Sequence, residues 1–140
     1  MNFKWMIIWL ILILVAIGVM IYFKIPQCSV MQTINASVEV KAIPSRILLG
    51  MNADKDSLKF GVVSPGTEVV RSVNTQYVRN ASVRVWPQGS FAEWMSIDQA
   101  EFSLASKENR QVMFHVNVPL DATSGNYTGK VVFCFKDVRN

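Results

Sequence analysis

An uninterrupted run of nineteen apolar residues, Trp5 to Phe23, begins at the fifth residue of the sequence. As an α-helix rising about 1.5 Å per residue, the run would be about 28 Å long, close to the thickness of a bilayer's hydrocarbon core. Lys4 and Lys24 stand just outside its ends, where their ammonium groups can reach lipid headgroups. The sequence therefore predicts one membrane-spanning helix over residues 5–23, after a short tail of residues 1–4.

The segment that follows the run favours an anchor that is kept rather than cleaved. A secretory signal peptide has an apolar core of about 7–15 residues and then a small-residue cleavage site. Here the run is longer, and Tyr22 to Pro26 offers no such site. The segment Ile25 to Cys28 bears a faint resemblance to a lipoprotein cleavage box, although Gln27 is large for its position. An uncleaved signal anchor is therefore the prediction, and lipidation at Cys28 is its alternative.

The orientation of this anchor is predicted from the chain on either side of it. A very short amino-terminal tail before a large carboxy-terminal domain is usual for anchors that translocate the carboxy-terminal side. Three N-x-[ST] sequons, which are glycosylation acceptors in secreted proteins, lie beyond the span, at Asn35, Asn80 and Asn126. We therefore expect a single-pass membrane glycoprotein whose carboxy-terminal domain lies outside the cytoplasm.

Composition sets the domain organisation and excludes one class of partner. Residues 24–35 form a short polar stalk in this interpretation, and residues 36–140 are enough for one domain of ordinary size. Lys4 and Lys24 supply half of the formal net charge of +4. The remaining charge is small and scattered, whereas a nucleic-acid surface needs clustered Lys and Arg. The expected partners are therefore the lipid bilayer, through residues 5–23, and another protein, with no nucleic acid.

The part of the chain beyond the stalk has the period of two that is typical of half-buried strands. Apolar residues alternate with polar ones in short segments bounded by Pro, Gly and Ser turns, and no helical period follows Lys24. The segments that show strand character are 38–42, 46–49, 58–60, 68–78, 83–85, 102–104, 112–118 and 131–135. About seven to eight short strands in one domain predict an all-β fold, an immunoglobulin-like β-sandwich.

Two stretches resemble known immunoglobulin-like domains. Leu58 to Thr67, then Arg71 to Val73 and Arg79 to Val85, resemble the F-G-x-V-x-P-G … R-x-V … G-N-A-x-V-R-V pattern of major-sperm-protein and spindle-type domains. Val118 to Gly129 is similar to the last hairpin of extracellular bacterial and archaeal Ig-like modules. Arg79 departs from the pattern, which usually has Gly there. The resemblance implies the fold and, together with the anchor, an archaeal cell-envelope protein; it implies no particular function.

The residues that carry catalysis or bind metals are not arranged for either role. His115 is the only histidine, and a general base or metal ligand needs partners that cannot be assigned from the sequence. Asn52, Asp54 and Asp56 suggest calcium, but the loop lacks the glycine and distal glutamate of an EF-hand. We therefore expect no enzyme, no cofactor and no metal site.

The two cysteines, Cys28 and Cys134, allow three outcomes. They could pair with each other, Cys28 could bridge to a second chain, or they could stay reduced. In an Ig-like sandwich the entering chain and the end of the last strand tend to lie at opposite poles. Cys134 is also expected to point away from the core and remain reachable. A bridge to a second chain or a reduced Cys28 is therefore favoured over an intramolecular bond.

Large aromatic residues between Trp86 and Trp94 are the candidates for a partner-binding surface. Trp86 ends a strand, Phe91 follows a Pro-Gln-Gly loop, and Trp94 begins the next apolar segment. Trp94 is expected to be the tryptophan that plugs the space between the sheets. Because a loop tip rarely keeps a large ring without a partner, Phe91 is the first candidate for docking.

The favoured function is a non-catalytic, membrane-anchored extracytoplasmic module that docks on another protein or supports it, in the cell envelope or a surface appendage. An accessory subunit of a membrane enzyme or transporter is the alternative, with residues 5–23 packed against partner helices. A carbohydrate-binding module is a weaker third. The helix offers Ala16 and Gly18 as small residues but no GxxxG motif, so it does not choose between these classes.

Overall fold

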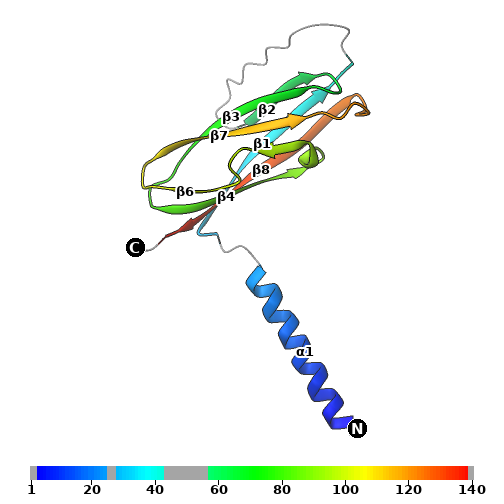
Figure 1. Ribbon diagram of the computed structural model, residues 1–140, viewed down its shortest axis with the longest axis vertical. Helices are drawn as coiled ribbons and strands as arrows, with labels where there is room; N and C mark the ends of the chain where they lie inside the picture. The colour runs from blue at the N-terminus through cyan, green and yellow to red at the C-terminus, as the bar shows by residue number, and fades with distance from the viewer. Residues whose placement is uncertain (1–2, 25–27, 43–56, 139–140) are drawn as a thin grey trace.

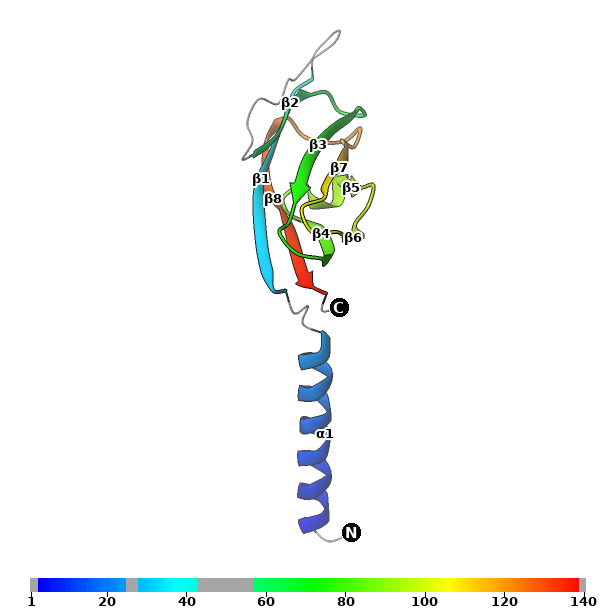
Figure 2. The same ribbon diagram turned by 90° about the vertical axis from the view of Figure 1, so that its left-hand side faces the viewer.

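One long helix precedes a domain built of strands in the computed structural model, which describes residues 3–24, 28–42 and 57–138. The helix α1 (Phe3–Lys24) contains the whole apolar run and extends from one end of the domain (Figures 1 and 2). Among the described residues, no helix meets the length and hydropathy required of a membrane span.

Within the described ranges, eight strands form two sheets that pack face to face (Figure 2). The larger sheet has the order β2-β1-β8-β4-β6 and the smaller one the order β3-β7-β5. The strands of the larger sheet are β2 (Ser57–Val63), β1 (Val30–Val40), β8 (Gly125–Asp137), β4 (Ala81–Gly89) and β6 (Glu101–Leu104). Those of the smaller sheet are β3 (Glu68–Gln76), β7 (Asn109–Asn117) and β5 (Met95–Ile97), which follows the short 3₁₀ helix η1 (Ala92–Trp94). The expectation of a mostly β domain with seven to eight strands is therefore confirmed.

The core lies between the sheets and is filled by the apolar residues that alternate along the strands. Burial alternates along β6, where Phe102 and Leu104 are buried, and along most of β7. Phe114 of the smaller sheet meets Phe133 of the larger one edge to face, with ring centroids 6.2 Å apart. Because period-two alternation places every second side chain on one face, the inner face could be assigned from the sequence alone.

The first strand begins earlier than expected and pairs with the last one. Val30 to Asn35 belong to β1. The prediction that residues 24–35 form a stalk is therefore wrong for residues 30–35. Val30 lies opposite Phe135, and the antiparallel pairing continues to Val40 opposite Gly125. On its other edge, β1 pairs in parallel with β2 from Asn35 onward. Pairing with a strand about 100 residues away leaves no local signal, which explains the error.

Two predicted features fall outside the described residues. They are the strand at 46–49 and the loop of Asn52, Asp54 and Asp56 that was considered for calcium. Both stay predictions.

Gly89 and Gly129 allow β4 and β8 to approach each other closely. Gly89 has a φ of +118°, and a Cβ built on it would lie 2.4 Å from the Cα of Gly129. A Cβ on Gly129 would lie 2.5 Å from the carbonyl oxygen of Gln88. Distances this short between a side chain and backbone require the strands to move apart.

Substituting Gly129 should therefore destabilise the domain. We expect Gly129→Ala to lower the free energy of unfolding by about 1–3 kcal/mol, the usual cost of overpacking. Denaturant unfolding of the variant would measure this change. Gly125→Ala is the matched control, since the nearest atom to its Cβ would be 4.0 Å away. Equal stability of the two variants would show that β4 and β8 separate without cost.

Candidate functional site

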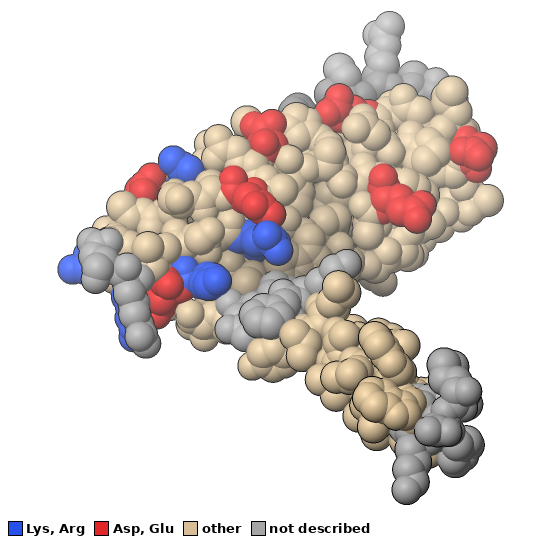
Figure 3. Space-filling view, turned by 60° about the horizontal axis from the view of Figure 1, so that its bottom comes forward, with Lys and Arg blue, Asp and Glu red and all other residues tan. Residues whose placement is uncertain are grey.

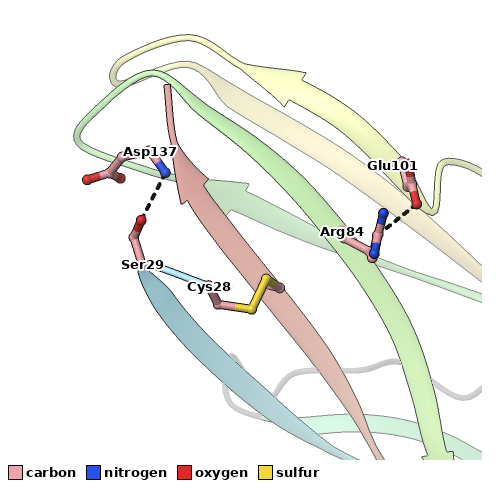
Figure 4. The surroundings of a disulfide bond; sticks show 6 residues. Cys28, Ser29, Arg84, Glu101 and Asp137 are labelled. Atoms are coloured by element: carbon pink, nitrogen blue, oxygen red, sulfur yellow. Dashed lines mark hydrogen bonds and ion pairs between the residues drawn. A yellow bond between two sulfur atoms is a disulfide. The ribbon is translucent and has the colours of Figure 1, made fainter. Parts of the chain in front are cut away.

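The end of the domain nearest α1 in the chain is made by four segments that are far apart in sequence. We call it the proximal pole: residues 28–29, 77–80, 105–107 and 136–138. A disulfide joins Cys28 to Cys134 across this end, with a Cα–Cα distance of 5.3 Å (Figure 4). Beside it, the Ser29 amide donates to the Phe135 carbonyl at 2.8 Å, and the Asp137 amide donates to the Ser29 hydroxyl at 3.1 Å. The entering chain is thus fixed to the end of β8.

The predictions for the cysteines are wrong in two respects. Cys28 and Cys134 do not lie at opposite poles, because antiparallel pairing of β1 with β8 puts the start of one beside the end of the other. Cys134 does not stay reachable either, since it is 5% exposed. It lies on the outer face of β8, in line with Met31 of β1 and Arg84 of β4, so the neighbouring strands flank it on both sides. No free cysteine occurs in the described chain.

A carboxylate at the proximal pole binds two side chains that follow β3. The Tyr77 hydroxyl donates to Oδ1 of Asp137 at 2.9 Å, and Nη1 of Arg79 donates to Oδ2 at 2.6 Å. The Tyr77 ring also stacks on Phe135, with centroids 4.9 Å apart. The hydrogen bond to Asp137 raises the pKa of the Tyr77 phenol, with further contributions from burial and from the Asp137 charge. The network holds the loop of residues 77–80 against the end of β8.

The loop before β7 closes the proximal pole on its other side. The Ser106 amide donates to the side-chain oxygen of Asn80 at 2.8 Å, and the Ser106 hydroxyl donates to the Val78 carbonyl at 2.8 Å. The Lys107 amide donates to the Tyr77 carbonyl at 2.7 Å. These bonds link the loops and leave the side chains of Val78, Arg79 and Lys107 exposed.

Phe91, the first candidate for docking, is a core residue, so that prediction is wrong. Its side chain is 1% exposed and meets Phe60 edge to face, with centroids 6.2 Å apart. The chain after Gly89 turns back over the end of the sandwich, and the Phe91 ring lies above Gly129, 3.3 Å from where a Cβ there would be. A ring that ends a loop in the sequence therefore fills the core of the folded domain.

The two tryptophans considered with Phe91 have different surroundings. Trp94 is half-buried at the end of η1 and packs against the core, and the centroid of its ring lies 4.6 Å from that of Tyr127. Trp86 is half-buried on the outer face of the larger sheet, opposite Val132. Of the three aromatic candidates, Trp86 alone lies on an outer sheet face.

Beside Trp86, the outer face of the larger sheet carries a shallow groove of about 610 Å³. Its lining comes from four adjacent strands and includes amide, hydroxyl and ammonium groups from Asn35, Ser37, Ser57, Lys59, Gln88, Thr128 and Lys130. These groups can form hydrogen bonds with a polar ligand.

His115 lies between two carboxylates on the outer face of the smaller sheet. Its Nδ1 is 2.7 Å from Oε1 of Glu68, and its Nε2 is 3.9 Å from Oδ1 of Asp98. Across the described ranges, no three His, Cys, Asp or Glu side chains are grouped to hold a metal ion. The arrangement orients the imidazole of His115 on a strand surface.

The three sequon asparagines occupy different positions. Asn126 is exposed on β8 opposite Glu39, and Asn80 is exposed at the proximal pole. Asn35 is exposed on β1, between Ser57 of β2 and Lys130 of β8. Whether any of them is glycosylated remains a prediction.

The proximal pole is the feature that sequence reasoning missed. The one signal available was Arg79 at a position where the resembled pattern has Gly. Nothing in the sequence indicated that Arg79 would lie beside Lys136, because the two come together only through the pairing of β4 with β8.

Comparisons with known proteins leave the family open. No protein-family model and no curated protein matches the chain. Among solved structures, the chain is similar to the crystal structure of a Burkholderia pseudomallei antigen and type I fimbria protein. The two are 15% identical with a TM-score of 0.36, over 76% of this chain and 98% of the other. Identity and structural similarity this low do not carry over the neighbour's role.

Proposed function

We propose that this chain is a non-catalytic, membrane-anchored Ig-like module. In this proposal α1 anchors it, and the β-domain docks outside the cytoplasm on another protein of the cell envelope or of a surface appendage. The observation that carries the proposal is the disulfide between Cys28 and Cys134, four residues after the end of α1. Disulfides persist in oxidising compartments and are rare in the cytosol. A disulfide at this position therefore supports an external domain.

The anchor is supported by the sequence run and by the side chains of α1. Nineteen consecutive residues carry no charge, and the described side chains from Ile7 to Tyr22 are all exposed in the isolated chain. Several are about half to two-thirds exposed, for example Leu14 at 61% and Met20 at 70%. A helix that is apolar all round needs an apolar environment, and a bilayer supplies one.

Protease accessibility in intact cells tests the orientation. We expect protease to release the β-domain, which a carboxy-terminal tag makes detectable, while α1 stays with the cells. In the same cells, the cysteines should react with a thiol-specific reagent under denaturing conditions only after reduction. A domain that is protected until lysis, with two reactive thiols, would place it in the cytoplasm and contradict the proposal.

Affinity capture from a detergent extract separates the docking module from an accessory subunit. Envelope or filament proteins among the captured partners would support the module. Integral membrane proteins held through α1 would instead favour a subunit of a membrane complex. Trp86→Ala is the informative variant, because Trp86 alone among the aromatic candidates lies on an outer sheet face.

A further inference from the structure

We propose that the proximal pole is a lipid-contact surface, in which Arg79, Lys107 and Lys136 face the phosphates of anionic lipid headgroups. The inference rests on the proposed anchoring by α1 and adds a second, electrostatic contact between the domain and the bilayer.

The chain between α1 and the domain is short enough to bring this surface to the headgroups. Four Cα steps separate Lys24 from Cys28, and a fully extended chain covers at most about 14 Å in four steps. The polar layer of one leaflet is itself about 5–7 Å thick. Because the disulfide fixes Cys28 to Cys134, the end of β8 is held within the same reach.

A pocket of about 640 Å³ at the proximal pole has the lining to receive a phosphate group. Arg79 and Lys136 contribute cations, Ser29 and Asn80 contribute polar groups, and the carboxylate of Asp137, which is paired with Arg79, also lines the pocket. The Arg79 side chain is 68% exposed even though it is paired with Asp137, so its remaining guanidinium donors stay accessible. A guanidinium suits phosphate recognition because it offers several donors in a planar fork.

The charge of the proximal pole favours an anionic surface. Its carboxylate, Asp137, is paired with Arg79. Glu108, which borders the pole, accepts a hydrogen bond from the Ala105 amide at 2.8 Å and lies 3.5 Å from Arg110. Lys107 and Lys136 are exposed, and no ion pair involves them in the part of the chain that the structure describes. Among the described residues, therefore, no carboxylate is ion-paired with either ammonium group.

Apolar side chains stand next to these cations. Val78 is 69% exposed beside Arg79, and Val138 is 50% exposed two residues after Lys136. Figure 3 looks toward this end and shows Lys and Arg on its left side, where Asp and Glu lie among them, whereas the right side of the domain shows acidic side chains alone. Apolar groups among Lys and Arg are typical of surfaces that lie at the membrane interface.

The sequon at Asn80 lies within the proposed lipid contact. A glycan there would stand between the proximal pole and the bilayer, because Asn80 lines the pocket. The contact therefore requires Asn80 to be unmodified, and a glycan on Asn80 in the native protein would overturn it. Asn126, outside the pole, is not restricted in this way.

Amide hydrogen exchange of the full chain in nanodiscs tests the contact directly. One set of discs contains phosphatidylcholine alone, and the other contains phosphatidylcholine mixed with phosphatidylglycerol. The amides of residues 78–80 and 105–107 should exchange more slowly in the anionic discs, while the loop of residues 119–124 should be unchanged. The double variant Lys107→Gln, Lys136→Gln should lose this protection by roughly fivefold per lysine, the effect expected for a cation at an anionic surface.

A control variant distinguishes a local contact from a general effect of charge. Lys41→Gln with Lys130→Gln makes the same change in net charge outside the proximal pole and should keep the protection. Equal exchange in both kinds of disc, or equal loss in both variants, would overturn the inference and leave the anchor intact. A chain that does not enter either disc would instead contradict the anchor, and the lipid contact with it.

Discussion

Replacing Cys134 by Ser should lower the free energy of unfolding of the full chain by about 4–5 kcal/mol. The bond joins residues with a sequence separation of 106. A disulfide stabilises a protein by restricting the conformational entropy of its unfolded chain, and the effect grows with the length of the closed loop. Removing this bond therefore stabilises the unfolded state. Because a whole domain is stable by only about 5–15 kcal/mol, this change would remove a large part of its stability. Denaturant unfolding in detergent measures it.

Three controls belong to this experiment. Cys28→Ser should have the same effect as Cys134→Ser, and the double variant should show no further loss. Reduction of the wild-type protein should bring it to the stability of the variants. A loss below about 1 kcal/mol would mean that the proximal pole is held mainly by its hydrogen bonds and by Tyr77, Arg79 and Asp137.

The second large effect is expected at Phe91. Phe91→Ala should cost about 3–5 kcal/mol, because truncating a fully buried phenylalanine removes its apolar burial and leaves a cavity. The cavity would lie between Phe60 and Gly129, against which the ring packs. Thermal or denaturant unfolding would detect this loss.

Leu120→Ala is the matched control for Phe91→Ala. Leu120 is also a large apolar residue in a connecting segment, but it is 87% exposed. Its truncation should change stability by less than about 0.5 kcal/mol. If Phe91→Ala left stability intact and weakened partner capture, the ring would be a contact residue and its burial in the core would be wrong.

The alternation of apolar and polar residues was sufficient to predict several strands that line the core. In β6 and β7 every buried position is apolar and most of the other positions are polar, so the sequence indicated both the strand and its buried face. In β8 the pattern was incomplete. Val132 and Cys134 lie on the outer face yet are buried, because β8 is the central strand of the larger sheet and its neighbours cover it.

The candidate site could not be predicted to the same extent. The sequence offered Trp86, Phe91 and Trp94 as neighbours, but folding buries Phe91, leaves Trp94 half-buried and places Trp86 on an outer face. How a loop turns over the end of a sandwich depends on contacts with β8 and β2, which are distant in the chain. The spacing of residues in the sequence does not indicate such contacts.

By itself, the sequence determined the helix that contains the apolar run, the all-β character of the domain and most of the residues that fill its core. These follow from local composition and from the period of two, which are properties of neighbouring residues. The tertiary structure alone decided that Cys28 meets Cys134, that Phe91 is core and that Arg79, Lys107 and Lys136 share one pole. Each of these depends on which strands pair, and pairing is set by the free energy of the whole sandwich rather than by any one segment.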